Sequence, residues 1–470
     1  MNFKTIFRSF KNKDMRKRIF AVIGILVAYR LLAHIPVPLG DASTFRQAVD
    51  NLINGTDLGG FINLISGGGL TNFSIILVGL SPYITASIVM QLLTKAIPRM
   101  EELNNDGETG RRKISQWTRI LTVPLAILQS IAYIYILFQE VLAAGTTGTV
   151  DPTMQEWALA ITAMTAGSIL LMWLGELITE QGIGNGISTV IFCSIVSAFP
   201  RTFASMTEQL LDTSQGTLNL FGWLDIPVNP AMFFIMLGLL VGLIVVIYIL
   251  VKINEAQRII TINYAKRVHG NSAYGGIKSI MPIKLIAAGV VPVIFAVAFL
   301  SVPAFIGQLI LKADPASTIG SNMVSWFSAP SASTYDATVG LQGTDFIYPA
   351  VYFVLVVMFT YFYTSIVFNA QEISENLQKQ GGFIEGVRPG KQTEKYFNKV
   401  VNRLNLFGAL ALGIIAMLPY IVDYIFIVTI GYPLGLSISG TGLLIVVTVA
   451  LENLRQINSR ALMVTYDDYQ

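Results

Sequence analysis

Hydrophobic residues in this chain are gathered into long apolar runs, and most polar residues lie in the segments between them. An α-helix needs about 20 apolar residues to cross the roughly 30 Å hydrocarbon core of a bilayer. About ten runs approach that length. The predicted spans cover residues 19–35, 75–97, 120–141, 157–177, 187–199, 231–251, 285–311, 346–368, 404–421 and 434–451. The pattern therefore predicts an all-α polytopic membrane protein with ten transmembrane helices.

Composition and charge agree with this class and assign an orientation. Hydrophobic residues make up 53% of the chain and charged residues only 13%, against about 25% charged in an ordinary soluble domain. Lys and Arg are concentrated on the cytosolic side of membrane proteins. Here 27 of the 31 basic residues lie before span 1, in alternate connections or after span 10, whereas Arg46, Arg201 and Lys312 fall on the other side. Both termini are therefore expected in the cytosol. The short connection between spans 4 and 5 is the one cytosolic connection without a basic residue.

The longer connections differ in composition between the two sides. On the cytosolic side, residues 254–282 and 369–399 are charged and contain glycine, as docking surfaces often do. On the outer side, residues 146–155 and 314–343 are rich in Gly, Ser, Thr, Pro and Ala, as solvated connectors usually are. We expect cytosolic surfaces that bind partners and outer connections without a folded domain.

One apolar segment is too short to span a bilayer. Residues 61–65 read Phe-Ile-Asn-Leu-Ile and run into Ser66 and three glycines just before span 2. This pattern predicts either a re-entrant helix buried in protein or an interfacial helix capped by glycine. Periodicity alone leaves both interpretations open.

Groups for catalysis or cofactor binding are scarce. The single cysteine, Cys193, cannot form an internal disulfide, and His34 and His269 lie far apart without a nearby cysteine. Neither a zinc site nor a cofactor is therefore expected. Residues 107–115 (GETGRRKIS) lack the glycine that directly precedes the lysine of a phosphate-binding loop. Residues 182–186 (GIGNG) lie between two spans and not between a strand and a helix, which excludes a dinucleotide-binding motif.

Ionisable residues at membrane depth, which ion-coupled transporters and intramembrane enzymes use, are also few. Glu176 and Glu180 lie at the cytosolic end of span 4. Asp423 lies near an outer end, and Arg30 is close enough to the outer surface to snorkel. We interpret all four as terminal anchors. An ion-coupled secondary transporter and an intramembrane enzyme stay as alternatives, but the inventory favours a wide, mostly apolar path without a reactive centre.

Two segments carry a specific resemblance. Residues 74–93 (SIILVGLSPYITASIVMQLL) and 173–188 (WLGELITEQGIGNGIS) resemble the span-2 and span-4/5 signatures of the SecY family. Further matches occur in family order over nearly the whole chain, namely NLISGGGL, GETGRRKISQWTR, INYAKR, GVVPVIFA, FYTSIVFN, GVRPGKQT and SGTGLLIVV. Through these motifs, the chain resembles the SecY family over nearly its whole length.

The resemblance implies a fold of two inverted, pseudo-symmetric five-helix halves that form a clamshell around an hourglass pore. The halves would be residues 1–200, with spans 1–5, and 201–451, with spans 6–10, followed by a cytosolic tail at 452–470. A lateral gate would lie between spans 2 and 3 on one side and 7 and 8 on the other. The segment before span 2 would be the re-entrant plug, which decides between the two interpretations left open above. Its residues would be Phe61, Ile62, Asn63, Leu64, Ile65, Ser66, Gly67, Gly68, Gly69 and Leu70.

The resemblance also implies which side chains form the functional sites. The pore ring carries over to Leu80, Ile84, Ile187, Ile191, Ile294 and Ile445. Cytosolic partners would dock at Arg258, Lys266, Arg267 and Arg388. Two positions depart from the family pattern: Ile259 follows Arg258 where a second arginine is common, and Glu385 stands where a proline is common. Both departures lie in the cytosolic connections that would bind partners.

The function implied by the resemblance is that of a protein-conducting channel in the bacterial cytoplasmic (inner) membrane. Such a channel translocates unfolded secretory polypeptides and releases transmembrane segments sideways into lipid. It is a passive pore and not an enzyme, driven by a cytosolic motor or a ribosome. The implied partners are the small membrane subunits SecE and SecG, the SecA motor ATPase, the ribosome, precursors with signal sequences, and membrane lipids.

Overall fold

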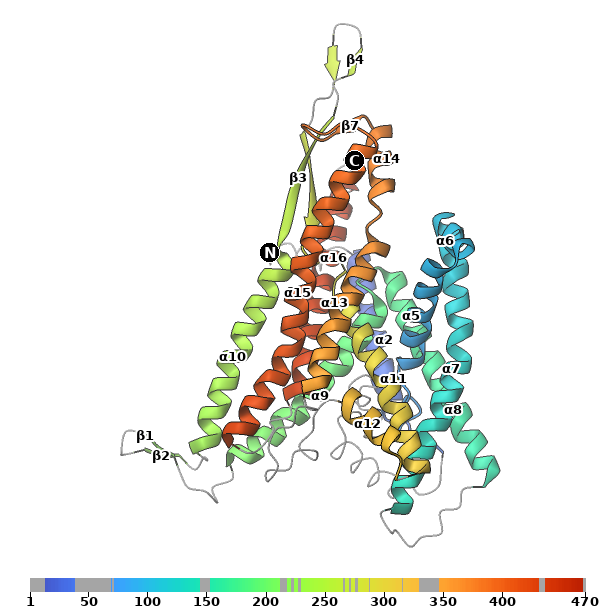
Figure 1. Ribbon diagram of the computed structural model, residues 1–470, viewed down its shortest axis with the longest axis vertical. Coiled ribbons are helices and arrows are strands. Elements are labelled where there is room, and N and C mark those ends of the chain that lie inside the picture. The colour runs from blue at the N-terminus through green and yellow to red at the C-terminus, as the bar shows by residue number, and fades with distance from the viewer. Residues whose placement is uncertain are drawn as a thin grey trace.

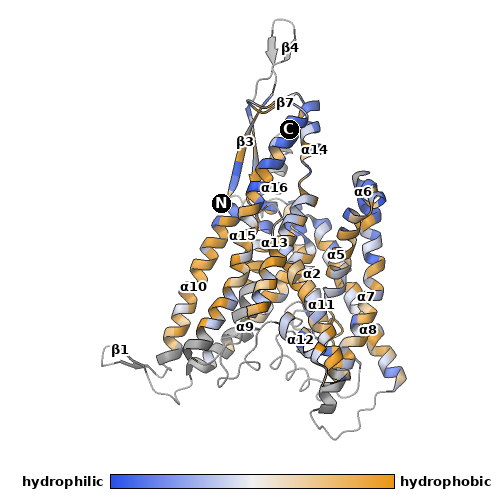
Figure 2. Cartoon of the chain, in the orientation of Figure 1, coloured by the Kyte–Doolittle hydropathy of each residue, from blue (hydrophilic) through white to orange (hydrophobic). Residues whose placement is uncertain are grey.

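The computed structural model shows an elongated helical bundle with an extension of strands and short helices at one end (Figure 1). The residues that it describes are 13–38, 69, 72–143, 153–211, 218–220, 224–226, 230–264, 267–269, 272–274, 278–286, 288–314, 316–328, 346–430 and 436–467. Hydrophobic residues dominate the body of the bundle, and hydrophilic residues gather at the end that carries α6, β3, β7 and α14 (Figure 2). This distribution is that of a protein whose solvent is a bilayer with water on either side.

Each of the ten predicted spans coincides with one long helix. These are α2 (Lys13–Leu32), α5 (Ser81–Ala96), α7 (Glu108–Ala143), α8 (Met154–Gln181), α9 (Gly186–Leu211), α10 (Pro230–Glu255), α11 (Val291–Ala313), α13 (Ile347–Val367), α15 (Lys391–Ile430) and α16 (Leu436–Asp467). Within the described residues, six helical segments are long and apolar enough to cross a membrane. They are Glu108–Phe138, Met154–Gln181, Phe233–Glu255, Val291–Leu311, Ile347–Lys379 and Lys391–Val422. The chain is therefore a multi-pass membrane protein.

Two helices begin later than the apolar runs predicted. The run at 75–97 becomes helical only at Ser81, and the run at 285–311 only at Val291. In both cases a glycine with positive φ, Gly79 at 62° or Gly289 at 64°, stands two residues before the helix. A proline follows in the first helical turn, where its missing N–H needs no partner. Hydropathy alone could not separate these turns from the helices that follow them.

The same two turns pack in the same way in each half of the bundle. A Cβ added at Gly167 of α8 would lie 2.2 Å from the carbonyl oxygen of Ile75, and one at Gly408 of α15 would lie 2.6 Å from that of Leu285. Glycine is therefore required where each helix crosses the turn that precedes α5 or α11. The same glycine contact thus occurs in both predicted halves, as their pseudo-symmetry implies.

Polar contacts join helices inside the bundle. The hydroxyls of Tyr29 in α2 and Ser194 in α9 lie 2.5 Å apart, and both residues are buried. Arg119 of α7 forms an ion pair with Glu176 of α8 at 2.7 Å. Glu176, interpreted from sequence as a terminal anchor, thus has a partner on the neighbouring helix.

The two long connections that are predicted to be cytosolic pack against each other. The strands β3 (Gln257–Tyr264) and β6 (Lys278–Lys284) form an antiparallel hairpin, and β7 (Gly382–Phe383) pairs with β3 to give a three-stranded sheet in the order β6-β3-β7. Beside it lies α14 (Ala370–Lys379). The buried residues of this unit are Ile260, Ile262, Ile283, Ala370, Leu377, Ile384, Phe397 and Val401. The sequence predicted two docking surfaces, and the structure joins them around one small hydrophobic core.

Further elements lie in the remaining connections. They are α6 (Pro98–Asn105), α12 (Thr318–Phe327) and the short hairpins β1 (Leu218–Leu220) with β2 (Leu224–Ile226) and β4 (Arg267–His269) with β5 (Ser272–Tyr274). The outer connection at 314–343, for which no folded domain is expected, contains the single helix α12. Gly307 and Gly320 allow α12 to pack closely on α11, because a Cβ at Gly320 would lie 3.2 Å from the carbonyl oxygen of Gly307.

The C-terminal part of α16 contacts the turn between α8 and α9. The predicted tail starts at residue 452, but the helix continues to Asp467. The backbone N–H of Gly184 donates to Oε1 of Gln456 at 2.7 Å. Arg18 of α2 donates to the carbonyl of Gln181 at 3.0 Å. A turn without a basic residue of its own is thus held by side chains from both ends of the chain.

Candidate pore and docking surface

The six predicted ring residues come from four helices and one helix cap. Leu80 caps α5, Ile84 lies in α5, Ile187 and Ile191 lie in α9, Ile294 lies in α11 and Ile445 lies in α16. Five are buried, and Ile187 is partly buried and packs on the same hydrophobic cluster as the others. Both halves of the bundle therefore contribute aliphatic side chains to one region of the core.

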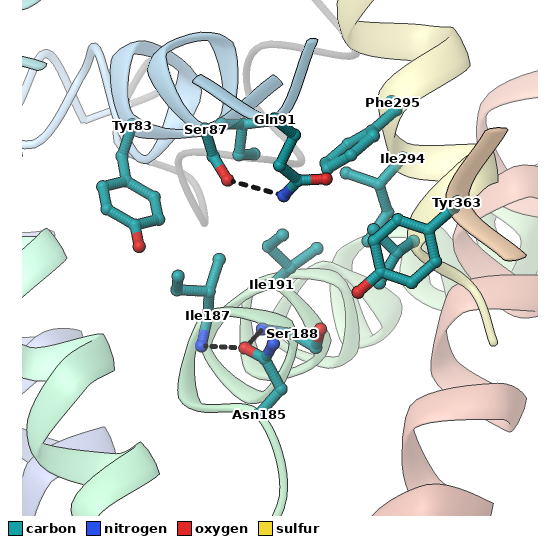
Figure 3. Close-up of a pocket in the computed structure, with 12 residues that line it drawn as sticks. Tyr83, Ser87, Gln91, Asn185, Ile187, Ser188, Ile191, Ile294, Phe295 and Tyr363 are labelled. Atoms are coloured by element: carbon teal, nitrogen blue, oxygen red, sulfur yellow. Dashed lines mark hydrogen bonds between the residues drawn. The ribbon is translucent and has the colours of Figure 1, made fainter. Parts of the chain in front are cut away.

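Four of these residues line a single cavity of about 80 Å³. Ile84, Ile187, Ile191 and Ile294 form an aliphatic part of its wall, and the last three are labelled in Figure 3. The remaining lining residues are Tyr83, Ser87, Gln91, Asn185, Ser188, Val291, Phe295 and Tyr363. Among the described residues that line the cavity, none carries a charge. The cavity is therefore uncharged, with aliphatic side chains on part of its wall and neutral hydroxyl and amide groups on the rest.

Local sequence explains why the α9 isoleucines face this cavity. Asn185 precedes the helix, and its Oδ1 accepts hydrogen bonds from the N–H of Ile187 at 3.0 Å and of Ser188 at 3.4 Å. This N-cap satisfies two donors that a helix start leaves unpaired. The four-residue spacing of Ile187 and Ile191 then places both on one face.

The helices of the predicted lateral gate are neighbours in the structure. Both α5 and α7 contact α11, and the rings of Tyr133 in α7 and Phe305 in α11 lie 5.1 Å apart. Phe295 of α11 in turn contacts Phe359 and Tyr363 of α13. The aromatic contact between Tyr133 and Phe305 joins the two sides of the predicted gate, and those of Phe295 join spans 7 and 8 on one side of it.

The predicted plug falls almost entirely outside the described residues. Residues 61–68 and Leu70 are not described, so the re-entrant helix stays a prediction. Gly69 is described, and its carbonyl accepts a hydrogen bond from the N–H of Ser74 at 2.8 Å.

Two of the predicted docking residues, Arg258 and Arg388, lie on the unit formed by the three-stranded sheet and α14. Arg388 is exposed in the connection between β7 and α15. Its carbonyl accepts a hydrogen bond from Oγ1 of Thr393 at 3.0 Å, and Oγ of Ser374 donates to the carbonyl of Gly390 at 2.9 Å. Gly386 and Gly390 have φ of 79° and 95°, which only glycine adopts readily. The backbone that carries Arg388 is therefore well fixed, and its guanidinium faces solvent.

The other docking residues are less completely described. Arg258 is exposed on β3. Arg267 opens β4, and Lys266 lies outside the described residues. The two departures from the family pattern, Ile259 and Glu385, are both exposed. They change the surface of the cytosolic unit and not its core.

The polar part of the cavity rim was not predicted. Gln91 and Ser87 lie in span 2, four residues apart, and Tyr363 lies in span 8. The available signal was the spacing of Tyr83, Ser87 and Gln91 along one face of an otherwise apolar helix. Without the neighbouring helices, such a row cannot be distinguished from a polar contact between spans.

The described part of the structure also brings together few groups that could bind a metal ion. The described residues contain no cluster of three or more His, Cys, Asp or Glu side chains that could hold a metal ion. The arrangement offers an aliphatic constriction and no assembled reactive centre within the described part of the chain.

Comparison with known proteins agrees with this geometry. The sequence model of the SecY family matches residues 74–454. The protein translocase subunit SecY of Streptomyces coelicolor is 38% identical over 468 residues, which are 98% of each chain. That of Corynebacterium glutamicum is 36% identical over 471 residues, again 98% of each chain.

Solved structures share the fold. One is described as the structure of a protein-conducting channel and has a TM-score of 0.60 at 19% sequence identity. The match covers 93% of this chain and 90% of that chain. Another, which concerns the plug domain of the SecY protein, has a TM-score of 0.61 at 20% identity with the same coverage. The extent of the sequence matches decides the assignment: this chain belongs to the SecY family.

Proposed function

We propose that this chain is the pore-forming subunit of a protein-conducting channel in the bacterial cytoplasmic membrane, with both termini in the cytosol. The observation that carries the proposal is the uncharged cavity that Ile84 of α5, Ile187 and Ile191 of α9 and Ile294 of α11 line together, with Leu80 and Ile445 in the same hydrophobic cluster. An ion that passes between such aliphatic side chains would lose its water without gaining another ligand from them. Flexible aliphatic side chains can nevertheless move apart for an unfolded polypeptide.

The proposed mechanism is passive opening of the bundle. A polypeptide crosses between the two halves, and a sufficiently apolar segment leaves through the separated contacts of α5 and α7 with α11. Residues 61–70 act as a plug below the ring. The chain supplies the path and no chemical step.

A cytosolic motor of the SecA type or a ribosome would supply the driving force, and SecE and SecG would accompany the chain in the membrane. The exposed guanidinium of Arg388 can form bidentate hydrogen bonds with carboxylate or phosphate groups. Arg258, Lys266 and Arg267 would extend the same docking surface. One structural neighbour, Sec61, is described in a ribosome–channel complex from the endoplasmic reticulum, which supports the ribosome as a partner.

Reconstitution tests the proposal directly. Proteoliposomes that contain the chain with its small subunits, a SecA-type motor and ATP should protect a secretory precursor from added protease. The same precursor without its signal sequence is the control and should stay accessible. Vesicles that protect neither precursor, or that instead accumulate small solutes against a gradient, would contradict the proposal and favour a transporter.

A further inference from the structure

One face of α5 carries three polar side chains that the aliphatic ring does not use. Tyr83, Ser87 and Gln91 are spaced four residues apart and therefore lie above one another on the helix. All three line the cavity, and Figure 3 shows them extending from α5 toward the space that Ile187 and Ile191 face. The row runs from beside the ring toward the cytosolic end of α5. We call these three residues the polar track.

Within the described part of the structure, the side-chain amide of Gln91 forms a hydrogen bond through its nitrogen but not through its oxygen. Its Nε2 donates to Oγ of Ser87 at 3.1 Å. Its Oε1 is buried and has no hydrogen-bond partner among the described residues. Burying a carbonyl oxygen without a donor destabilises the closed cavity. A ligand that brings its own donor would remove this penalty.

The chemistry of the cavity indicates what that ligand is. The lining is uncharged, so it does not select acidic or basic side chains. Every residue of a polypeptide except proline carries one backbone N–H, and an unfolded chain in an apolar constriction leaves these groups without water. A neutral acceptor beside the ring suits this shared donor, whatever the sequence that passes.

We propose that the polar track binds the main chain of the extended polypeptide as it approaches the ring, with Oε1 of Gln91 accepting a backbone N–H. This inference rests on the function proposed above and adds a specific contact to it. The hydroxyls of Ser87 and Tyr83 would continue the contacts toward Ile84. From Gln91 to Tyr83 the helix rises about 12 Å, which matches roughly four residues of extended chain.

The opposite wall is compatible with this placement. Ser188 of α9 and Tyr363 of α13 also line the cavity and carry hydroxyls. The Oδ1 of Asn185 already accepts hydrogen bonds from the N–H groups of Ile187 and Ser188 at the start of α9. It is therefore not an unpaired acceptor as Oε1 of Gln91 is. Gln91 is therefore the residue of the rim whose acceptor is both buried and unpaired.

The test compares two semisynthetic precursors with the same signal sequence. One carries a glycine tract and the other a tract of sarcosine, N-methylglycine, which lacks the N–H donor. With wild-type channel and motor in proteoliposomes, the glycine tract should cross about fivefold faster, the effect of one ordinary hydrogen bond. Gln91→Met keeps the length of the side chain but removes the amide, so the ratio of the two rates should fall close to one.

A matched control is available in α7. The Oε1 of Gln129 is also buried without a partner, but Gln129 does not line the cavity. Gln129→Met should therefore keep the wild-type ratio. Equal loss of the ratio in both variants, or an unchanged ratio in Gln91→Met, would overturn the proposal.

The wild-type measurement is informative even if a variant fails to insert. A ratio close to one in the wild type would show that backbone N–H groups are not recognised, and would overturn the polar track alone. Failure of the wild type to move either precursor would contradict the channel function as well.

Discussion

The C-terminal end of α8 and the N-terminal end of α9 approach so closely that a single methyl group at Gly186 should separate them. A Cβ added there would lie 1.7 Å from the carbonyl oxygen of Gly175 and 2.8 Å from Oγ1 of Thr179. Ordinary contact begins at 3.4 Å, so the two backbones must part by roughly 1.7 Å. The hydrogen bond from the N–H of Gly186 to Oγ1 of Thr179, now 2.9 Å, would lengthen with them.

The energetic terms have opposite signs but unequal size. Overpacking of this kind costs about 1–3 kcal/mol, and the strained hydrogen bond adds about 1 kcal/mol. Alanine gains at most about 1 kcal/mol over glycine in a helix interior, and less at a first helical residue. Gly186→Ala should therefore lower the free energy of unfolding by about 1–3 kcal/mol.

A fluorescence-monitored thermal unfolding experiment in detergent measures this effect. Gly24→Ala in α2 is the matched control, because a Cβ there meets nothing within 4 Å. Its midpoint should stay at or slightly above the wild-type value. Since Ile187 follows Gly186, the first variant should also raise ion leak through resting vesicles. Equal midpoints for the two variants would refute the close approach of α8 and α9.

Three further outcomes are expected. Replacing Ile84, Ile191, Ile294 and Ile445 together by asparagine should wet the constriction and raise ion conductance at rest several-fold, whereas wild-type conductance would show that these side chains do not form the seal. Deleting residues 61–70 should also raise resting conductance, and an unchanged current would count against a plug in that segment. Arg388→Glu should sharply reduce motor-driven export while leaving insertion and resting conductance near normal, and Arg388→Lys should fall between the two because lysine keeps the charge without the planar fork. Normal export by a correctly inserted Arg388→Glu channel would remove the docking assignment, and misinsertion would indicate a role in orientation.

Most of the membrane fold could be predicted because the bilayer imposes a length on apolar runs. Hydropathy does not report backbone conformation, however, which is why residues 75–80 were assigned to span 2. The glycine and proline at positions 79 and 82 were the available signal for a turn. The cytosolic sheet was harder to predict, because Asn263 pairs with Phe383 from a distant part of the chain. No local pattern encodes such a pairing.

The candidate site shows a different limit. An isoleucine such as Ile191 or Ile294 has no property that separates a pore residue from an ordinary core residue. Only the motifs around these positions singled them out. Gln91 could not be recognised even so, because its significance depends on a cavity shared by four helices. The sequence pattern of one helix shows which of its faces is polar. Whether that face lines a cavity or contacts another span depends on the neighbouring helices.

The contact between α16 and the turn after α8 has a consequence for biosynthesis. Gln456 is 272 residues downstream of the Gly184 that it binds. When α8 and α9 have left the ribosome, this turn therefore has no support from α16, and the N-terminal five helices must wait for the last helix before their cytosolic end is complete. A chain that stops short of α16 would expose the turn to proteases, so membrane quality control could distinguish unfinished copies from finished ones by a feature of the first half.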